Sequence, residues 1–96
     1  MTSKQRAYLR SLANSIDAIF QIGKNGINDN LIKQLNDALE VRELIKITVL
    51  ETAPASAKDL SFEISKRTNS ITIQVIGNKI TLFRQKEKDS KINLPT

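Results

Sequence analysis

Apolar side chains recur along much of the chain at helical spacing. Leu9, Leu12 and Ile16 belong to one such run, and spacings of three and four positions predict helices over residues 3–15 and 29–42. A third stripe predicts a helix that ends near Thr68. Residues that favour helix N-caps stand where the three helices should begin, namely Thr2, Asn28 and Ser56.

Other apolar segments are shorter or alternate with polar residues, which is typical of strands. These segments cover residues 19–22, 44–50, 71–76 and 79–84. The predicted order is helix, strand, helix, strand, helix, strand, strand, which indicates an α/β fold. Crossovers through helices favour a largely parallel sheet, whereas Gly77-Asn78 is suited to a tight hairpin that makes the last strand antiparallel.

The 96 residues suffice for one domain, which we expect to be a monomer. After residue 84, only Ile92 and Leu94 are large and apolar. We therefore expect a domain over residues 1–84 and a basic C-terminal tail over residues 85–96 that is disordered or draped on the surface. No apolar run has the length of a membrane span, and no signal peptide is recognisable at the start. We expect a cytoplasmic protein without a membrane partner.

The net positive charge of the chain indicates a class of binding partner. Fifteen Lys and Arg against ten Asp and Glu give a net charge of +5, and the pI is near 9.8, as in proteins that bind polyanions. Residues 1–26 carry four basic side chains against one acidic, and residues 84–96 carry four against two. Residues 27–43 have the opposite balance, with two basic against four acidic. The positive field should gather near the N-terminal segment and the tail.

Cysteine and histidine are both absent, which removes thiolate nucleophiles, the commonest general base and the commonest metal ligands. Asp37, Glu40 and Glu43 are interpreted as solvated surface beside Lys33 and Arg42. No set of residues supplies a nucleophile, an activating base and an oxyanion hole together. We expect no enzyme, no catalytic residue, no metal and no cofactor.

Gly23-Lys24-Asn25-Gly26 joins a predicted strand to the helix capped by Asn28. Glycines let backbone approach a ligand closely, the helix N-terminus favours anions, and Lys24 adds a positive charge, so phosphate is the natural ligand. The alternative is an ordinary strand-to-helix turn in which glycine relieves strain. The spacing matches neither a Walker A loop nor a dinucleotide fingerprint.

Arg6, Arg10 and Asn14 form a stripe along the flank of the first helix. They are either a solvated helix face or part of one basic surface that continues to the glycine loop, because only one short strand separates the two. Among the aromatic residues, Phe20 and Phe62 are expected in the core, whereas Tyr8 is a candidate for stacking on a base.

Several segments resemble, in order and spacing over nearly the whole chain, the YhbY-type proteins, which consist of one CRM domain. The family often has His at Asn14, Thr-Gly at Thr68-Asn69 and Tyr-Arg-Pro at Phe83-Arg84-Gln85. The matching segments are Lys4-Gln5-Arg6, Leu9-Arg10, Leu12-Ala13, Ile22-Gly23-Lys24-Asn25-Gly26, Ala38-Leu39-Glu40, Glu43-Leu44-Ile45-Lys46, Gln74-Val75-Ile76-Gly77 and Lys91-Ile92-Asn93-Leu94-Pro95.

The resemblance implies a two-layer α/β domain with three helices and a mixed four-stranded sheet, like the C-terminal domain of bacterial translation initiation factor 3. It also implies RNA contacts from the glycine loop and neighbouring basic residues, and a role with ribosomal RNA in precursors of the large ribosomal subunit. The candidate RNA-binding residues are Gly23, Lys24, Asn25, Gly26, Asn28, Lys4, Arg6, Arg10, Arg84 and Lys86. The alternatives are a protein-interaction module that uses the acidic second helix or an exposed sheet, and an enzyme acting on a small phosphorylated molecule.

Overall fold

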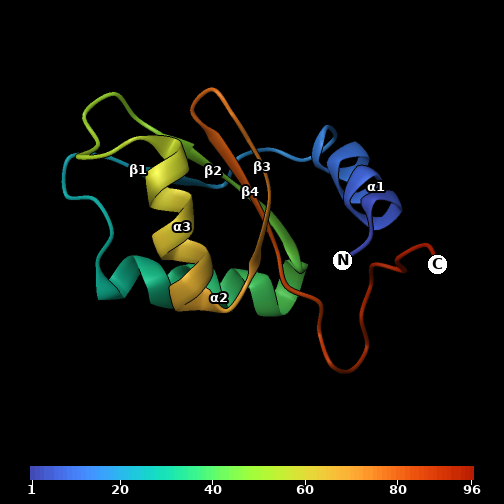
Figure 1. The fold of residues 1–96 in the computed structure, drawn as a ribbon. Coiled ribbons are helices and arrows are strands. Elements are labelled where there is room, and N and C mark those ends of the chain that lie inside the picture. The colour runs from blue at the N-terminus through green and yellow to red at the C-terminus, as the bar shows by residue number, and fades with distance from the viewer.

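The computed structural model describes residues 1–96 and contains the seven elements in the predicted order (Figure 1). None of its helices combines the length and the apolar character that crossing a membrane requires. The elements are α1 (Ser3–Ala13), β1 (Phe20–Ile22), α2 (Asp29–Arg42), β2 (Leu44–Val49), α3 (Ala57–Thr68), β3 (Ile71–Ile76) and β4 (Lys79–Phe83).

Three N-caps and one C-cap fix the ends of the helices. The side chains of Thr2, Asn28 and Ser56 each accept a hydrogen bond from the backbone three residues on, and Thr2 completes a capping box with Gln5. Asn69 ends α3 in the left-handed conformation, with φ of 52°. Because Asn tolerates this conformation better than most residues, it takes the place of the glycine that the family often has.

The four strands form one mixed sheet in the order β1-β2-β4-β3. β1 pairs in parallel with β2, while β4 pairs antiparallel with both β2 and β3. β1, β2 and β3 therefore run in the same direction and only β4 is antiparallel, as expected of a largely parallel sheet with one antiparallel hairpin strand. β4 nevertheless lies between β2 and β3 and not at an edge of the sheet. The mixed four-stranded sheet that the family resemblance implies is confirmed.

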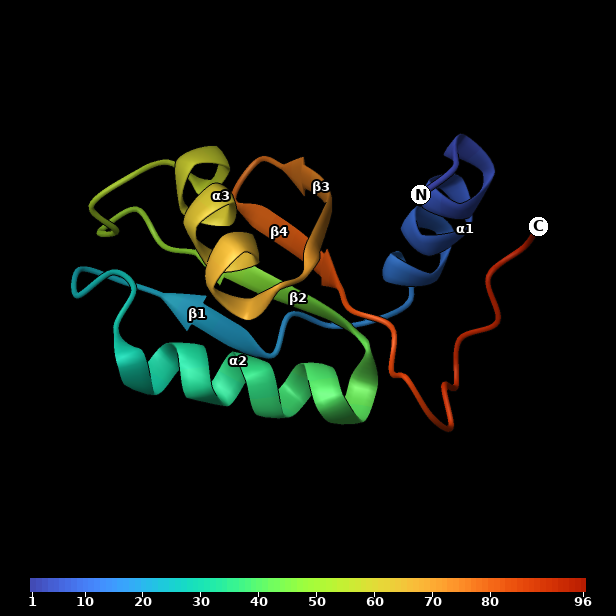
Figure 2. The ribbon, with the colours of Figure 1, turned by 60° about the horizontal axis from the view of Figure 1, so that its bottom comes forward.

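α2 and α3 cover one face of the sheet and give the expected two layers, while α1 packs against one end of the other face (Figures 1 and 2). Alternation along β2 explains both contacts. Ile45 and Ile47 point into the main core, whereas Leu44 points to the α1 side. Leu9 and Ala13 of α1 complete this second, smaller core with Ile73 and Phe83.

The tail is draped on the domain and makes defined contacts. Glu43, which follows α2, is fully buried, and its carboxylate accepts hydrogen bonds from the amides of Lys86 (3.0 Å) and Lys91 (2.6 Å) and from the hydroxyl of Ser90 (2.6 Å). The interpretation of Glu43 as solvated surface is wrong. The sequence did not reveal this role, because the residues that donate hydrogen bonds to the Glu43 carboxylate lie more than 40 positions further along the chain.

Burial tends to raise the pKa of Glu43, but the hydrogen bonds from Ser90, Lys86 and Lys91 outweigh burial and hold the pKa below its ordinary value of 4.5. The carboxylate is therefore ionised at neutral pH. Ile92 pairs this polar anchor with an apolar contact to the α1 core.

The aromatic residues only partly follow the expectation. Phe20 is half-buried against the main core, and Tyr8 is 38% exposed. Phe62 is 68% exposed, so its placement in the core is wrong. The buried stripe of α3 runs through Leu60 and Ile64, and residue 62 lies between them on the opposite side of the helix.

Candidate nucleic-acid interface

The glycine loop closes as a short turn at the end of β1. The amide of Gly26 donates to the carbonyl of Gly23 at 3.0 Å, and Gly26 has φ of 62°, which favours glycine. The side chain of Asn28 then caps α2 by accepting from the Leu31 amide at 2.8 Å. The alternative of an ordinary strand-to-helix turn therefore accounts for the conformation of Gly26. It does not account for the other residues of the loop.

Several backbone donors around this turn have no partner within the protein. The amides of Lys24 and Asn25 in the loop, and of Asp29 and Asn30 in the first turn of α2, donate to no protein group. These donors lie at the positive end of the helix dipole. Together they form a place where an anion can be hydrogen-bonded by backbone.

The loop borders a hollow of about 380 Å³ that is polar and contains no carboxylate. Lys24 is its one charged lining residue, and Leu31 its one apolar residue. Asp29 lies close in sequence, but its carboxylate is paired at 2.7 Å with Arg67 of α3. The remaining lining residues are Gln21, Gly23, Asn25, Gly26, Asn28, Asn30 and Gln34.

The connection between β2 and α3 supports the loop from behind. A Cβ at position 26 would lie 3.0 Å from Cγ of Pro54, and a Cβ at position 23 would lie 3.6 Å from Oγ1 of Thr52. Gly26 therefore permits the close packing of the two loops, whereas a side chain at position 23 would make only an ordinary contact. Thr52 and Pro54 could not be predicted as neighbours of the loop, because no local pattern in the sequence indicates which loops meet in space.

The basic residues of α1 lie far from the glycine loop. Figures 1 and 2 show α1 at one end of the molecule and the connection between β1 and α2 at the other end. The expectation that one continuous basic surface runs from Arg6 and Arg10 to the glycine loop is therefore wrong. Although few residues separate the two in sequence, the extended segment before β1 and β1 itself carry the chain along the sheet between them.

Two of the candidate RNA-binding arginines are engaged within the protein. Arg6 donates from Nη1 to the carbonyls of Thr72 (2.9 Å) and Ile73 (3.1 Å) and so joins α1 to β3. Arg84 donates to the carbonyl of Thr68 (2.6 Å) and is paired with Glu40 (3.1 Å). Their first role is to join elements of the fold.

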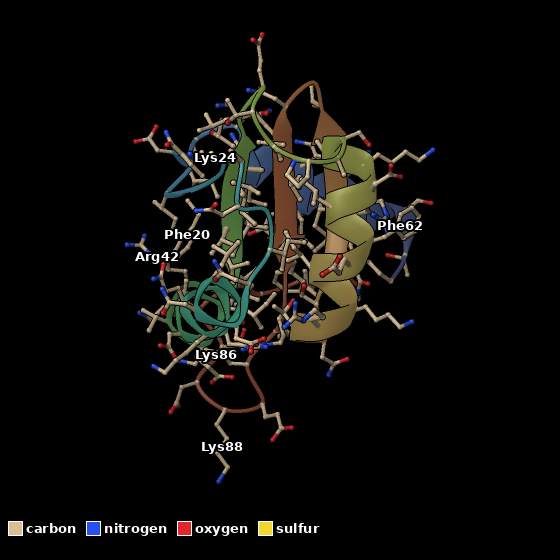
Figure 3. All side chains as sticks on the ribbon, turned by 90° about the vertical axis from the view of Figure 1, so that its left-hand side faces the viewer. Phe20, Lys24, Arg42, Phe62, Lys86 and Lys88 are labelled. Carbon is tan, nitrogen blue, oxygen red and sulfur yellow. The ribbon has the colours of Figure 1, made fainter.

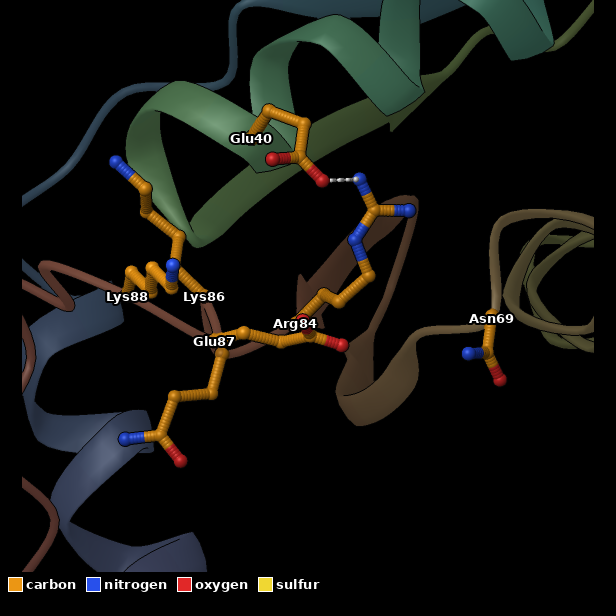
Figure 4. Close-up of a pocket in the computed structure, with 7 residues that line it drawn as sticks. Glu40, Asn69, Arg84, Lys86, Glu87 and Lys88 are labelled. Carbon is orange, nitrogen blue, oxygen red and sulfur yellow. Dashed lines mark hydrogen bonds and ion pairs between the residues drawn. The ribbon is translucent and has the colours of Figure 1, made fainter.

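The other basic candidates lie on the same end as α1 and the tail. Arg10 is exposed and forms no ion pair, and Lys4 reaches the carbonyl of Thr96 at 3.4 Å. Lys86 lies beside Arg84 in a second hollow of about 590 Å³ (Figure 4). This hollow mixes cations with the carboxylates of Glu40 and Glu87, unlike the acid-free hollow at the glycine loop. Figure 3 shows the separation of Lys24 from Lys86.

The acidic second helix offers few free carboxylates to a partner. Asp29 pairs with Arg67, and Glu43 is buried under the tail. The other two carboxylates of this segment are also paired, Asp37 with Lys33 at 3.4 Å and Glu40 with Arg84 at 3.1 Å. The acidic surface that the protein-interaction alternative would use on this helix is therefore partly neutralised by pairs within the protein, whereas its use of an exposed sheet is unaffected.

Comparison with known proteins agrees with this architecture. The family model of the CRS1 / YhbY (CRM) domain matches residues 1–84. The "Probable RNA-binding protein YqeI" of Bacillus subtilis is 43% identical over 95 residues, which cover 99% of each chain. An "RNA-binding protein" of Haemophilus influenzae is 28% identical, with 99% of this chain and 95% of the relative covered.

A solved structure and a longer relative extend the comparison. The solution structure of SAV1595 from Staphylococcus aureus, described as a candidate RNA-binding protein, superimposes with a TM-score of 0.82 at 50% identity and covers 99% of each chain. CRS2-associated factor 1 of Arabidopsis thaliana chloroplasts is 21% identical, and the match covers 14% of its length. The small α/β fold of this chain is thus shared with a solved structure over nearly its whole length. The chain belongs to the CRM-domain family.

Proposed function

We propose that this protein binds RNA and grips the phosphate backbone with the glycine loop and the N-terminus of α2. One observation carries the proposal: amides of the loop and of α2 without protein partners surround Lys24 in a hollow that has no carboxylate. Backbone donors and a helix dipole suit phosphate, and a single mobile lysine adds charge. The names of several relatives, which describe RNA binding, support the same ligand.

The proposed mode of action is binding without chemistry. In this proposal, a monomeric cytoplasmic protein holds ribosomal RNA in precursors of the large ribosomal subunit, as the family resemblance implies. Arg10 and Lys4 of the α1 region and Lys86 of the tail provide further basic side chains away from the loop, while Arg6 joins α1 to β3 and Arg84 joins β4 to α2 and α3. Long-range attraction from these basic side chains raises affinity without reading sequence.

The loop is tested by two substitutions that differ in their risk to the fold. Gly26→Asp adds a carboxylate where phosphate should lie, and RNA binding should weaken at least about tenfold. Because a Cβ there approaches Pro54 closely, Lys24→Gln is the gentler variant. It should weaken binding to all RNA sequences alike and reduce the slope of log affinity against log salt by about one unit.

The matched controls are Gly77→Asp and Lys33→Gln. Gly77 also has a positive φ, 57°, and has open space around it, so this variant introduces the same charge and a similar backbone strain outside the hollow. Lys33 is an exposed lysine of α2. Binding of RNA, duplex DNA and free nucleotides should be measured at two salt concentrations with far-UV circular dichroism alongside. If the loop variants bind RNA as tightly as their controls, the loop has no role.

A further inference from the structure

The outward face of α3 carries an aromatic side chain that the fold does not use. Phe62 is 68% exposed, although Leu60 and Ile64 on either side of it are buried. Lys58 and Lys66 lie four positions before and after it, so one lysine stands a helical turn away on each side. Figure 3 shows Phe62 pointing away from the molecule.

Only some of the charged side chains on this face form ion pairs within the protein. Lys58 and Lys66 are exposed, and neither forms an ion pair. The nearby carboxylate of Glu63 is paired with Arg67 at 3.5 Å. The face therefore presents two free cations around an aromatic ring. Of its two acidic neighbours, Glu63 is already neutralised, and Asp59, three positions before Phe62, is the one free carboxylate.

We propose that this face is a second RNA contact, in which Phe62 stacks on an unpaired base and Lys58 and Lys66 contact the adjoining phosphates. An aromatic side chain with flanking cations suits single-stranded nucleic acid, because each nucleotide offers a flat base and an anionic group. A protein partner would favour a continuous apolar patch. On this helix face, the positions around Phe62 are instead polar, including Ser65 and Asn69.

The face is connected to the glycine loop through the β2–α3 connection. Pro54 packs behind Gly26, Ser56 caps α3, and Lys58 follows in the first turn of the helix. Figure 3, viewed from the loop end, shows Lys24 and Phe62 on opposite flanks of this end. One RNA whose backbone is held at the loop thus extends as a single strand across the N-terminal end of α3 to Phe62. This inference rests on the proposed function.

A tryptophan at position 62 gives a direct readout, since the chain contains no other tryptophan. The probe is a single-stranded RNA of about 12 nucleotides without self-complementarity, and its blunt duplex is the comparison. Stacking should quench the fluorescence of Phe62→Trp when the single strand is added, whereas the duplex should not, because its bases are already stacked.

Affinity separates stacking from simple apolar contact. Phe62→Trp should bind the single strand at least as tightly as the parent protein, while Phe62→Leu and Phe62→Ala should both bind about tenfold more weakly. If leucine preserves affinity as well as phenylalanine does, or if the fluorescence of Phe62→Trp is unchanged at saturation, the proposal is wrong. Thermal unfolding should be unchanged in all three variants, because the side chain is exposed.

The lysines and the glycine loop complete the design. Lys58→Gln combined with Lys66→Gln should flatten the salt dependence of single-strand binding by about one to two units, with Lys33→Gln as the control lysine. If the parent binds no RNA, the proposed function fails and this inference fails with it. If Lys24→Gln weakens binding but Phe62→Ala does not, only the second contact is refuted.

Discussion

Glu43 shows how one residue joins distant parts of the chain. It has a positive φ of 65°, which is unfavourable for glutamate, and its carboxylate is fully buried. Both costs are offset because one carboxylate receives the Lys86 and Lys91 amides and the Ser90 hydroxyl. The two ends of the segment 86–91 are thereby fixed to the end of α2.

The attachment of the tail should depend on pH. Because the folded protein holds the pKa of Glu43 below 4.5, the ionised carboxylate stabilises the fold fully above that pH. This stabilisation is lost as the pH falls from 4.5 through the lower folded-state pKa. Amide signals of Lys86 and Lys91, followed by NMR across this range, should shift together as the tail detaches.

Glu43→Gln should detach the tail at neutral pH, because the amide cannot accept all three hydrogen bonds with a full charge. We expect the free energy of unfolding to fall by roughly 2–4 kcal/mol and trypsin to cleave faster after Lys86 and Lys88. Asp37→Asn, which changes an exposed carboxylate on the same helix, is the control. An intact, protease-resistant tail in Glu43→Gln would show that apolar contacts alone hold it.

Arg6 and Arg10 look equivalent in sequence but differ in the structure. Arg6 binds two carbonyls of β3, whereas Arg10 forms no ion pair and is exposed. Arg6→Gln should therefore reduce the free energy of unfolding by roughly 1–3 kcal/mol. Arg10→Gln should change stability by less than about 0.5 kcal/mol but flatten the salt dependence of RNA binding by about one unit.

Denaturant unfolding and RNA titrations of both variants measure this difference. Equal stability of the two variants would mean that the contact of Arg6 with β3 contributes nothing. An unchanged salt slope for Arg10→Gln would mean that the α1 surface does not touch RNA, so that binding is confined to the other end of the molecule.

At the scale of elements, local sequence determined most of what could be predicted. The caps Asn28 and Ser56 and the apolar stripes placed the helices within a few residues, because these signals act between neighbours in the chain. The register Leu44↔Phe83 shows what local patterns lack. The position of β4 between β2 and β3 depends on pairing between residues far apart in sequence.

The edge strand β3 illustrates how elements constrain one another. β3 is apolar apart from Thr72 and Gln74, contains no charge, and lies at the edge of the sheet. A register shift between Thr72 and Gln74 and the guanidinium of Arg6 at the adjacent carbonyls interrupt this edge. Such irregularities limit edge-to-edge pairing with other molecules. The register shift in β3 and the contact of Arg6 with β3 thus both limit pairing at this edge.

At the scale of the whole molecule, the candidate site divides into two parts. The molecule extends over 39 Å along its longest axis, with α1 and the tail at one end and the glycine loop at the other. The glycine loop itself, with Lys24 and Asn28, was predictable from its motif between a strand and a capped helix. Its separation from Arg10 was not, because the direction in which β1 crosses the sheet is a property of the assembled fold.

With the proposed RNA contacts at both ends, the protein suits a large, folded RNA better than a short one. Precursors of the large ribosomal subunit expose RNA segments that later become buried, and a shape-reading binder is released when its site closes. We therefore expect the protein to sediment with precursor large subunits and to be absent from polysomes. Lys24→Gln should shift it toward the top of the gradient, since a weakened loop no longer retains it.

A sucrose gradient of a cell extract, with the tagged protein followed across free, small-subunit, large-subunit and polysome fractions, measures this distribution. Lys33→Gln is again the matched control, because it removes the same charge from an exposed site on α2. Equal amounts on precursors and mature ribosomes would contradict a role confined to assembly. Sedimentation wholly as free protein, combined with tight RNA binding in vitro, would instead place the RNA partner outside the ribosome.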